Sequence, residues 1–518
     1  METNTDLARK IGQRMVVGFT GLEVPQELRD AVKRSHIANF ILFAENIESN
    51  AQLVSLCADL QTLVQEETGA PAFITIDQEG GVVSRLNEKE AAVVPSAMCV
   101  SATGDPANAY HAGLITAQEL RALGVNFNLA PCMDINSNPQ NPVIGVRSYG
   151  DSPETVSHYG TEMIRGFLDG KILCSAKHFP GHGDTAVDSH LSLPKVDKSL
   201  EELWQCELIP FQKAIDAGIP AMMTTHILFP QLEPGGVPAT MSRKIITELL
   251  KETMGFQGLV ISDCMMMQAI QAYYGTIHGI IAAFHAGVDL VFTCHSIAIA
   301  EEACKAAMDA IQNGTLSQAE MDASVEKILL YKKQLAPVPP NPQMVGSRPH
   351  REIVRTMMEK GISLVRAPEG NCPALGSNPL FLGSHPFRPT IASNPQDESI
   401  SFPKTMQALL GGCAQSTPVD PTSEEVAALL PMAKEHSSVV VGTYNGHIKT
   451  GQLELVRALA ALAVPVICVA LRNPYDLLSL PPNVTCIAAY EYDNLSMETV
   501  AKVLSGELQP VGKLPIQS

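Results

Sequence analysis

The sequence predicts an N-terminal (β/α)8 TIM barrel followed by a smaller C-terminal α/β sandwich domain. Three observations support this fold class. Short apolar runs rich in β-branched residues alternate with helical segments eight times within about the first 300 residues. No glycine fingerprint follows the first run, as a dinucleotide-binding sheet would require. Polar residues follow or end five of the runs, and such barrels carry their active-site residues at the carboxyl ends of the strands.

The predicted strands are the short apolar runs. They are expected at residues 16–19, 40–43, 73–76, 127–130, 172–176, 222–225, 259–262 and 290–292. The intervening segments have the periodicity of amphipathic helices. The clearest of them are residues 51–66, 107–122, 153–168, 200–217 and 242–254. Eight such units favour a closed barrel over an open sheet.

A proline-rich stretch at 336–350 predicts a stiff linker. We therefore expect a catalytic barrel domain at 1–335 and a second domain at 351–518. In the second domain, apolar runs alternate with helical segments, which predicts a sandwich around a small parallel sheet. The runs are expected at 380–382, 439–441, 466–470 and 486–489, and the helices at 423–436 and 451–462.

Composition excludes several classes of function. The chain of 518 residues is 45% hydrophobic and 17% charged, as is usual for a globular protein. Its net charge of −18 argues against partners such as nucleic acid or an anionic membrane surface. No apolar run is long enough for a membrane span, and no secretion signal is visible. Twelve cysteines without a CxxC pair fit reduced thiols, so we expect a cytoplasmic protein.

One predicted loop is rich in side chains that can donate or accept protons. Residues 177–190 read Lys-His-Phe-Pro-Gly-His-Gly-Asp-Thr-Ala-Val-Asp-Ser-His, with three histidines, two aspartates and a lysine. Glycine and proline make the segment too irregular for a helix. Ordering such a loop costs conformational entropy and buries little apolar surface, which is typical of loops kept for chemistry.

Two positions suggest catalysis, each with an open alternative. Asp263 ends a buried strand, so a rigid carboxylate there suits covalent or electrostatic catalysis. It is equally suited to cap the helix that follows. Asp188 and His190 form a candidate acid/base pair, in which the carboxylate orients the imidazole. Alternatively, His190 closes its loop by hydrogen bonding.

Other polar residues suggest ligand binding. Asp77 and Arg85 together match the hydroxyl groups of a sugar, although a salt bridge at the barrel rim is the alternative, and Arg147 has the same ambiguity. The histidines and aspartates of the 177–190 loop are also metal-ligand types. Because glycine and proline keep His178 and His182 off a shared helix face, we predict neither a metal nor another cofactor.

Residues 177–194 resemble the hallmark of family 3 glycoside hydrolases, and more narrowly that of their bacterial β-N-acetylglucosaminidases. The hallmark reads Lys-His-Phe-Pro-Gly-x-Gly, then Asp-Ser-His after four residues, then Pro after three more. Supporting matches lie at 76–81, 147–150, 238–242 and 254–263. The likeness extends from about residue 11 to about residue 335. Residues 439–447 and 512–515 resemble, more weakly, the second domain of two-domain members.

The resemblance implies a retaining mechanism in two steps. Asp263 would attack the anomeric carbon, while His190, partnered by Asp188, would protonate the leaving oxygen and then deprotonate water. A further set of residues would bind the terminal N-acetylglucosamine (GlcNAc). These are Asp77, Arg85, Arg147, Lys177 and His178.

The resulting hypothesis is an exo-acting β-N-acetylglucosaminidase that removes GlcNAc from GlcNAc-MurNAc fragments during peptidoglycan recycling (MurNAc is N-acetylmuramic acid). Because a neutral imidazole does not repel an anionic acceptor, a phosphorylase using the same site is an alternative. A non-catalytic carbohydrate-binding or scaffold barrel is the alternative from another class. The expected partner is a small carbohydrate, and the sequence does not address the oligomeric state.

Overall fold

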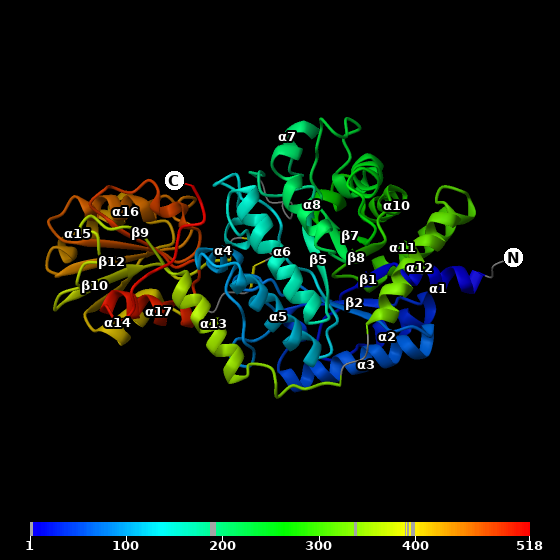
Figure 1. Cartoon of the computed structure of the whole chain (residues 1–518), viewed down its shortest axis with the longest axis horizontal. Helices are drawn as coiled ribbons and strands as arrows, with labels where there is room; N and C mark the ends of the chain where they lie inside the picture. The colour runs from blue at the N-terminus through cyan, green and yellow to red at the C-terminus, as the bar shows by residue number, and fades with distance from the viewer. Residues whose placement is uncertain are drawn as a thin grey trace.

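The computed structural model describes residues 4–186, 193–335, 339–388, 390, 393–394 and 399–517. Eight parallel strands follow one another around a closed barrel, and β1 pairs with β8 to complete it (Figure 1). The strands are β1 Met15–Val17, β2 Asn39–Leu42, β3 Phe73–Ile76, β4 Phe127–Asn128, β5 Leu173–Phe179, β6 Ala221–Thr224, β7 Leu259–Cys264 and β8 Leu290–Thr293. Each overlaps a predicted run, which confirms the barrel.

The barrel strands are buried on both faces. Side chains that point inward form their own core cluster, in which the rings of Phe73 and Phe127 meet edge to face with centroids 5.5 Å apart. Side chains that point outward pack under the surrounding helices in a larger cluster. Parallel strands covered on both faces read as continuous apolar runs, which is why the sequence reveals them so clearly.

Helices surround the barrel. They are α1 Asn4–Gln13, α2 Gln26–Ser35, α3 Asn50–Thr68, α4 Ala97–Ala102, α5 Ala107–Ala122, α6 Pro153–Asp169, α7 Leu200–Gln205, α8 Leu208–Asp216, α9 Gln268–Gln271, α10 Thr276–Ala286, α11 Ile297–Gln312 and α12 Gln318–Gln334. Short 3-10 turns η1 Ala44–Asn46, η2 Gly145–Arg147 and η3 Ala239–Met241 lie between them, and η4 Lys244–Thr253 is a π-helix.

The predicted helix at 200–217 is wrong as a single helix, because it breaks between α7 and α8. Cys206 leaves the helical region with φ −141° and ψ −88°. Pro210 explains the break, since a proline in a helix clashes with the carbonyl group four residues earlier. That carbonyl belongs to Cys206.

The second domain contains a six-stranded sheet with the order β11-β10-β12-β13-β14-β9. Helices α15 and α16 lie on one side of this sheet, and α14 and α17 lie on the other (Figure 1). The elements are β9 Ser363–Arg366, β10 Pro379–Gly383, α14 Phe402–Leu410, β11 Cys413–Ser416, α15 Ser423–Ala433, β12 Ser438–Thr443, α16 Gly451–Ala460, β13 Val466–Ala470, η5 Pro474–Leu477, β14 Thr485–Ala488 and α17 Asn494–Ser505.

The α/β sandwich is confirmed, but the sheet is mixed instead of purely parallel. Its edge strand β9 runs antiparallel to β14. Three of the four β9 residues are only half-buried, and β11 alternates between exposed and half-buried residues. Neither edge strand therefore forms the apolar run by which the other strands were predicted.

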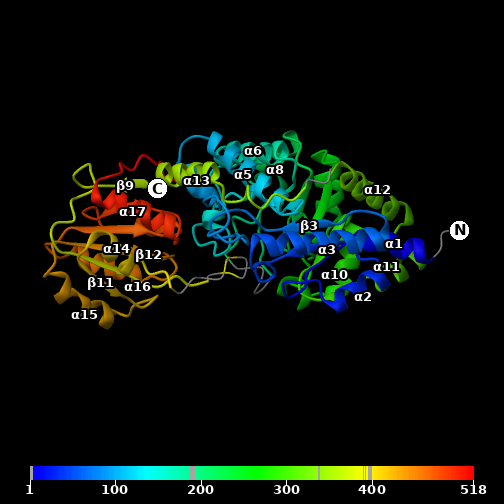
Figure 2. The ribbon, with the colours of Figure 1, turned by 90° about the horizontal axis from the view of Figure 1, so that it is seen from below.

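Helix α13, Arg348–Gly361, lies at the junction of the barrel and the second domain. It packs against α4 of the barrel. It also packs against α5 of the barrel and α17 of the second domain, and it lies between these two helices (Figure 2). The helix begins within the predicted linker, and the exact division at 336–350 stays a prediction. Within the described ranges, no helix combines the length and the apolar character that crossing a membrane requires.

Candidate active site

A cavity of about 530 Å³ lies at the carboxyl ends of the barrel strands. This volume is typical of small-molecule sites. Six of the predicted site residues line it. They are Asp77, Arg85, Arg147, Lys177, His178 and Asp263. The other two, Asp188 and His190, lie outside the described residues.

A buried ionic network forms one wall of the cavity. Glu79 receives two hydrogen bonds from Arg147, Nε to Oε2 at 2.9 Å and Nη2 to Oε1 at 2.8 Å. The Nζ atom of Lys177 lies 2.6 Å from Glu79 Oε1 and 2.7 Å from Asp77 Oδ1. A bidentate arginine and a bridging lysine hold the two carboxylates in a fixed geometry.

The charges of this network stabilise one another. Burial alone would raise the pKa of Glu79, but Arg147 and Lys177 outweigh burial and hold that pKa well below its usual value. Burial would lower the pKa of Lys177, whereas Asp77 and Glu79 raise it above its usual value. Both groups therefore stay charged at neutral pH.

Asp77 is the most accessible carboxylate of the network. Its side chain is 19% exposed, compared with 7% for Glu79. On its other side, Asp77 Oδ2 lies 3.8 Å from Arg85 Nη2. This loose ion pair between Asp77 and Arg85 faces the cavity, and the Asp77 carboxylate keeps lone pairs that can accept hydrogen bonds from hydroxyl groups. The salt bridge and the ligand-binding pair, which the sequence offered as alternatives, are therefore compatible.

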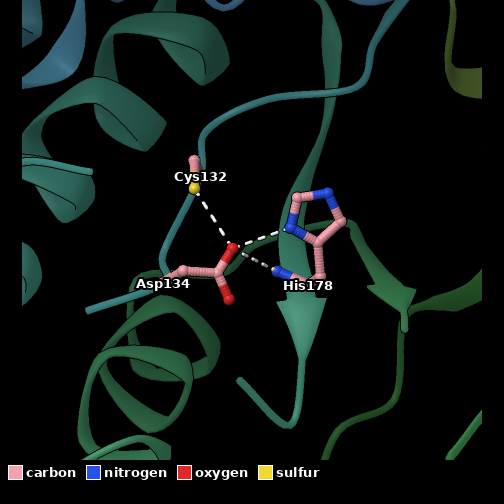
Figure 3. A group of neighbouring side chains, drawn as sticks. All are labelled: Cys132, Asp134 and His178. Atoms are coloured by element: carbon pink, nitrogen blue, oxygen red, sulfur yellow. Dashed lines mark hydrogen bonds and ion pairs between the residues drawn. The ribbon is translucent and has the colours of Figure 1, made fainter. Parts of the chain in front are cut away.

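Asp134 fixes the ring of His178 from behind the cavity. Its Oδ2 atom lies 2.7 Å from His178 Nδ1 (Figure 3). Its Oδ1 atom accepts a hydrogen bond from His182 N at 2.6 Å. Burial would raise the pKa of Asp134, but His178 lowers it to about 2. An ionised carboxylate only accepts hydrogen bonds, so His178 Nδ1 carries a proton. In the neutral ring, Nε2 is then the acceptor.

His182 is a second histidine of the cavity. Burial and the neighbouring His178 lower its pKa to about 4, against a weaker opposing effect of Asp134. His182 is therefore neutral at physiological pH, and its Nδ1 lies 3.0 Å from Thr185 Oγ1. It adds an uncharged polar surface instead of another cation.

Cys132, Asp134 and His178 are also grouped as metal ligands would be, with the relevant atoms within 4.8 Å of one another. Hydrogen bonds explain this grouping, because Asp134 Oδ2 accepts from the His178 backbone at 3.1 Å and from Cys132 Sγ at 3.2 Å (Figure 3). Burial also raises the pKa of the Cys132 thiol well above its usual value. A protonated thiol is a poor metal ligand.

Asp263 projects from the end of β7 into the same cavity. The backbone N–H of Cys264 donates to Asp263 Oδ1 at 2.6 Å, which fixes the carboxylate. The helix-cap alternative is wrong, because α9 begins after Met267 and has no side-chain cap. His226, which follows β6, has its Nε2 atom 3.0 Å from the carbonyl oxygen of Cys264, so it supports the end of β7 and is not among the residues that line the cavity.

Glu79 and Arg388 are two of the cavity-lining residues that sequence reasoning missed. Glu79 is the counterion of the network, and the only signal for it is a second carboxylate two residues after Asp77. Arg388 lines the cavity from the loop that follows β10 of the second domain. No local pattern could have identified it, because its contact with the barrel depends on how the domains pack.

Comparison with known families decides the class of this protein. The family described as "Glycosyl hydrolase family 3 N terminal domain" matches residues 6–330. The chain belongs to glycosyl hydrolase family 3. This confirms the resemblance and makes the chain a glycoside hydrolase, which argues against a non-catalytic scaffold.

Individual relatives of this family 3 protein agree. Beta-hexosaminidase A of Pseudoalteromonas piscicida is 37% identical over 335 residues, and the match covers 60% of this chain and 56% of that relative. The chain thus spans little more than half of that relative's length. A family 3 β-N-acetylglucosaminidase from Paenibacillus sp. str. FPU-7 is 38% identical, with a TM-score of 0.92 over 100% of this chain and 99% of the other. These comparisons support a β-hexosaminidase activity.

A solved β-glucoside phosphorylase is also similar in structure. It is 21% identical, with a TM-score of 0.82 over 99% of this chain and 95% of the other. Identity at this level shows a shared fold alone. It therefore does not favour the phosphorylase alternative.

Asp134 leads to a prediction for the pH dependence of stability in this family 3 protein. Its folded-state pKa of about 2 lies below the usual value of 3.8. Its contribution is therefore present above the usual pKa and is lost as pH falls through the folded one. The difference in unfolding free energy between wild type and Asp134→Asn should shrink by about 2 kcal/mol from about pH 5 to about pH 2.

Urea unfolding at a series of pH values measures that difference. Asp59→Asn is the matched control, since the Asp59 side chain is 60% exposed. Its difference from wild type should stay near zero. A difference for Asp134→Asn that does not change with pH would contradict the proposed charge on Asp134.

Proposed function

We propose that this family 3 enzyme is a retaining exo-β-N-acetylglucosaminidase. The observation that carries the proposal is the position of Asp263, whose fixed carboxylate shares one cavity with a cluster of sugar-binding groups. Asp77, Arg147 and Lys177 offer both acceptors and charged donors, as several adjacent hydroxyl groups require.

In the proposed mechanism, Asp263 attacks the anomeric carbon and forms a glycosyl-aspartate. His190, oriented by Asp188, protonates the departing oxygen, and the resulting neutral imidazole then takes a proton from water. Water attacks the same carbon from the face that the leaving group occupied, so two inversions give net retention. The hallmark motif supports these roles for Asp188 and His190.

The cavity also has an aromatic and apolar side. Phe43 and His295 stack with ring centroids 5.1 Å apart, and both line the cavity together with Met266. Burial lowers the pKa of His295, which favours its neutral form. Such a wall suits the carbon-bound hydrogens of a sugar ring or the methyl group of an N-acetyl substituent.

As the natural substrate we propose GlcNAc-MurNAc fragments of peptidoglycan, hydrolysed inside the cell during recycling. The names of the relatives support the GlcNAc part. All twelve cysteines lie in the described part of the chain as free thiols, which fits a reducing compartment.

Product analysis tests the proposal. Incubation with GlcNAc-MurNAc should release GlcNAc and MurNAc at the same rate in phosphate buffer and in a phosphate-free buffer. The first GlcNAc anomer seen by proton NMR should be β. The control substrate is the GlcNAc dimer, which lacks the lactyl group. Formation of GlcNAc-1-phosphate would indicate a phosphorylase, and a first product in the α form would exclude retention.

A further inference from the structure

The second domain contacts the two barrel loops that carry Arg85 and Arg147, both of which line the cavity. Arg388, from the loop after β10, itself lines the cavity. Its Nε donates to the carbonyl oxygen of Ser393 at 2.9 Å, and Ser393 Oγ accepts from the buried Arg472 at 3.0 Å. This side of the cavity therefore rests on a hydrogen-bonded network that belongs to the second domain.

Asn394 holds the first of these loops, residues 81–85. Its side chain accepts from Ser84 N at 2.7 Å and from Arg85 Nη1 at 3.3 Å, and it donates to Gly81 O at 3.1 Å. Its backbone N–H also donates to Val82 O at 2.8 Å. The loop has no regular secondary structure beyond one isolated bridge, so these bonds contribute much of its order.

Asn473 holds the second loop, which carries Arg147 at the end of η2. Its Oδ1 accepts from Val146 N at 2.9 Å, and its Nδ2 donates to Asn445 Oδ1 at 2.9 Å. Gly145 permits the close approach: it has φ +46°, and a Cβ there would lie 2.3 Å from Asn473 Oδ1. Arg147 follows two residues later, so Asn473 sets the backbone from which that guanidinium extends.

Tyr475 adds a second brace to the same loop. Its hydroxyl accepts from Asn136 Nδ2 at 2.7 Å and donates to Asn136 O at 3.2 Å. In turn, Asn136 Oδ1 accepts from Gly145 N at 3.0 Å. The turn before Arg147 is thus fixed twice from the second domain.

We infer that Asn394 and Asn473 are positioning residues, and that the second domain completes the sugar site by setting the two arginines, Arg85 and Arg147. The inference rests on the proposed function, because it assumes that these arginines bind the sugar. Its physical basis is that misplacing a binding group by about 1 Å, even through a distant change, costs up to about 100-fold in rate.

The test is kinetic and uses the full chain. Asn473→Ala and Asn394→Ala should each lower kcat/KM on an aryl β-GlcNAc by about 10- to 100-fold, mainly through KM. Asn473→Asp keeps the Oδ1 acceptor for Val146 N and should recover most of the loss. The matched control is Asn483→Ala, since Asn483 donates to Ala460 O at 2.8 Å within the second domain.

Three further measurements make the result decisive. Thermal unfolding of each variant distinguishes a loss of folding from a misplacement of Arg85 or Arg147 in a folded protein. Calorimetric titration with GlcNAc measures the affinity of the site for the sugar without turnover. A panel of aryl β-glycosides that includes the aryl β-GlcNAc reports the wild-type activity, and if wild type does not cleave the aryl β-GlcNAc, the proposed function fails. If wild type is active and Asn473→Ala matches it in KM and GlcNAc affinity, or if Asn483→Ala loses as much, the positioning role is overturned.

Discussion

Asp263→Asn is expected to lower turnover of an aryl β-GlcNAc on the order of 10⁴-fold. Asparagine keeps the shape of the side chain and the acceptor for Cys264 N, but it lacks the charge that attacks the anomeric carbon. The variant should therefore fold normally and still bind GlcNAc. Steady-state kinetics and thermal unfolding check both parts of this expectation.

The control for that substitution is Asp197→Asn, because the Asp197 side chain is 57% exposed. It should leave kcat unchanged. Azide provides a second check, since a small anion fits the space left in Asp263→Ala and should restore turnover while forming the glycosyl azide. If Asp263→Asn kept more than about a tenth of wild-type turnover, Asp263 would not be the nucleophile.

Glu79→Gln is expected to reduce the unfolding free energy by about 3 to 5 kcal/mol. The change removes the carboxylate that pairs with both Arg147 and Lys177, and among the ion pairs of the network it leaves that of Lys177 with Asp77. Since the pKa of Glu79 lies well below its usual value, its contribution is present throughout the neutral range and is lost only in strong acid. Urea unfolding near neutral pH measures the loss.

Activity should fall together with stability in Glu79→Gln, because the freed arginine and lysine no longer hold their positions. The matched control is Glu162→Gln, which breaks an exposed pair with Arg165, whose side chain is 61% exposed. Such a pair contributes about 0 to 1 kcal/mol. If both substitutions cost the same, the network does not stabilise the barrel.

Most of the barrel was predictable from the sequence because a parallel strand buried on both faces leaves a continuous apolar run. Each of the eight runs overlaps a strand. The edge strand β9 was missed for the converse reason, since most of its residues are only half-buried. The break between α7 and α8 was missed although Pro210 was visible, because helical periodicity continued across it.

The cavity was predictable as far as strand order determines it. Asp77, Lys177 and Asp263 lie at or near the carboxyl ends of three different strands, and a closed barrel brings those ends to one rim. The bridging role of Glu79 was not predictable, because it depends on side-chain packing. The presence of Arg388 at the cavity was not predictable either, because it depends on how the two domains pack. Such contacts join residues hundreds of positions apart and leave no local pattern.

The proposed mechanism requires that Asp263 form a covalent bond with the sugar. A 5-fluoro GlcNAc fluoride, which slows hydrolysis of the glycosyl-enzyme, tests it most directly through mass spectrometry of the digested protein. One fluoro-GlcNAc unit is expected on the peptide that contains Asp263, and none in Asp263→Asn. A label on another residue, or inactivation without any label, would contradict it.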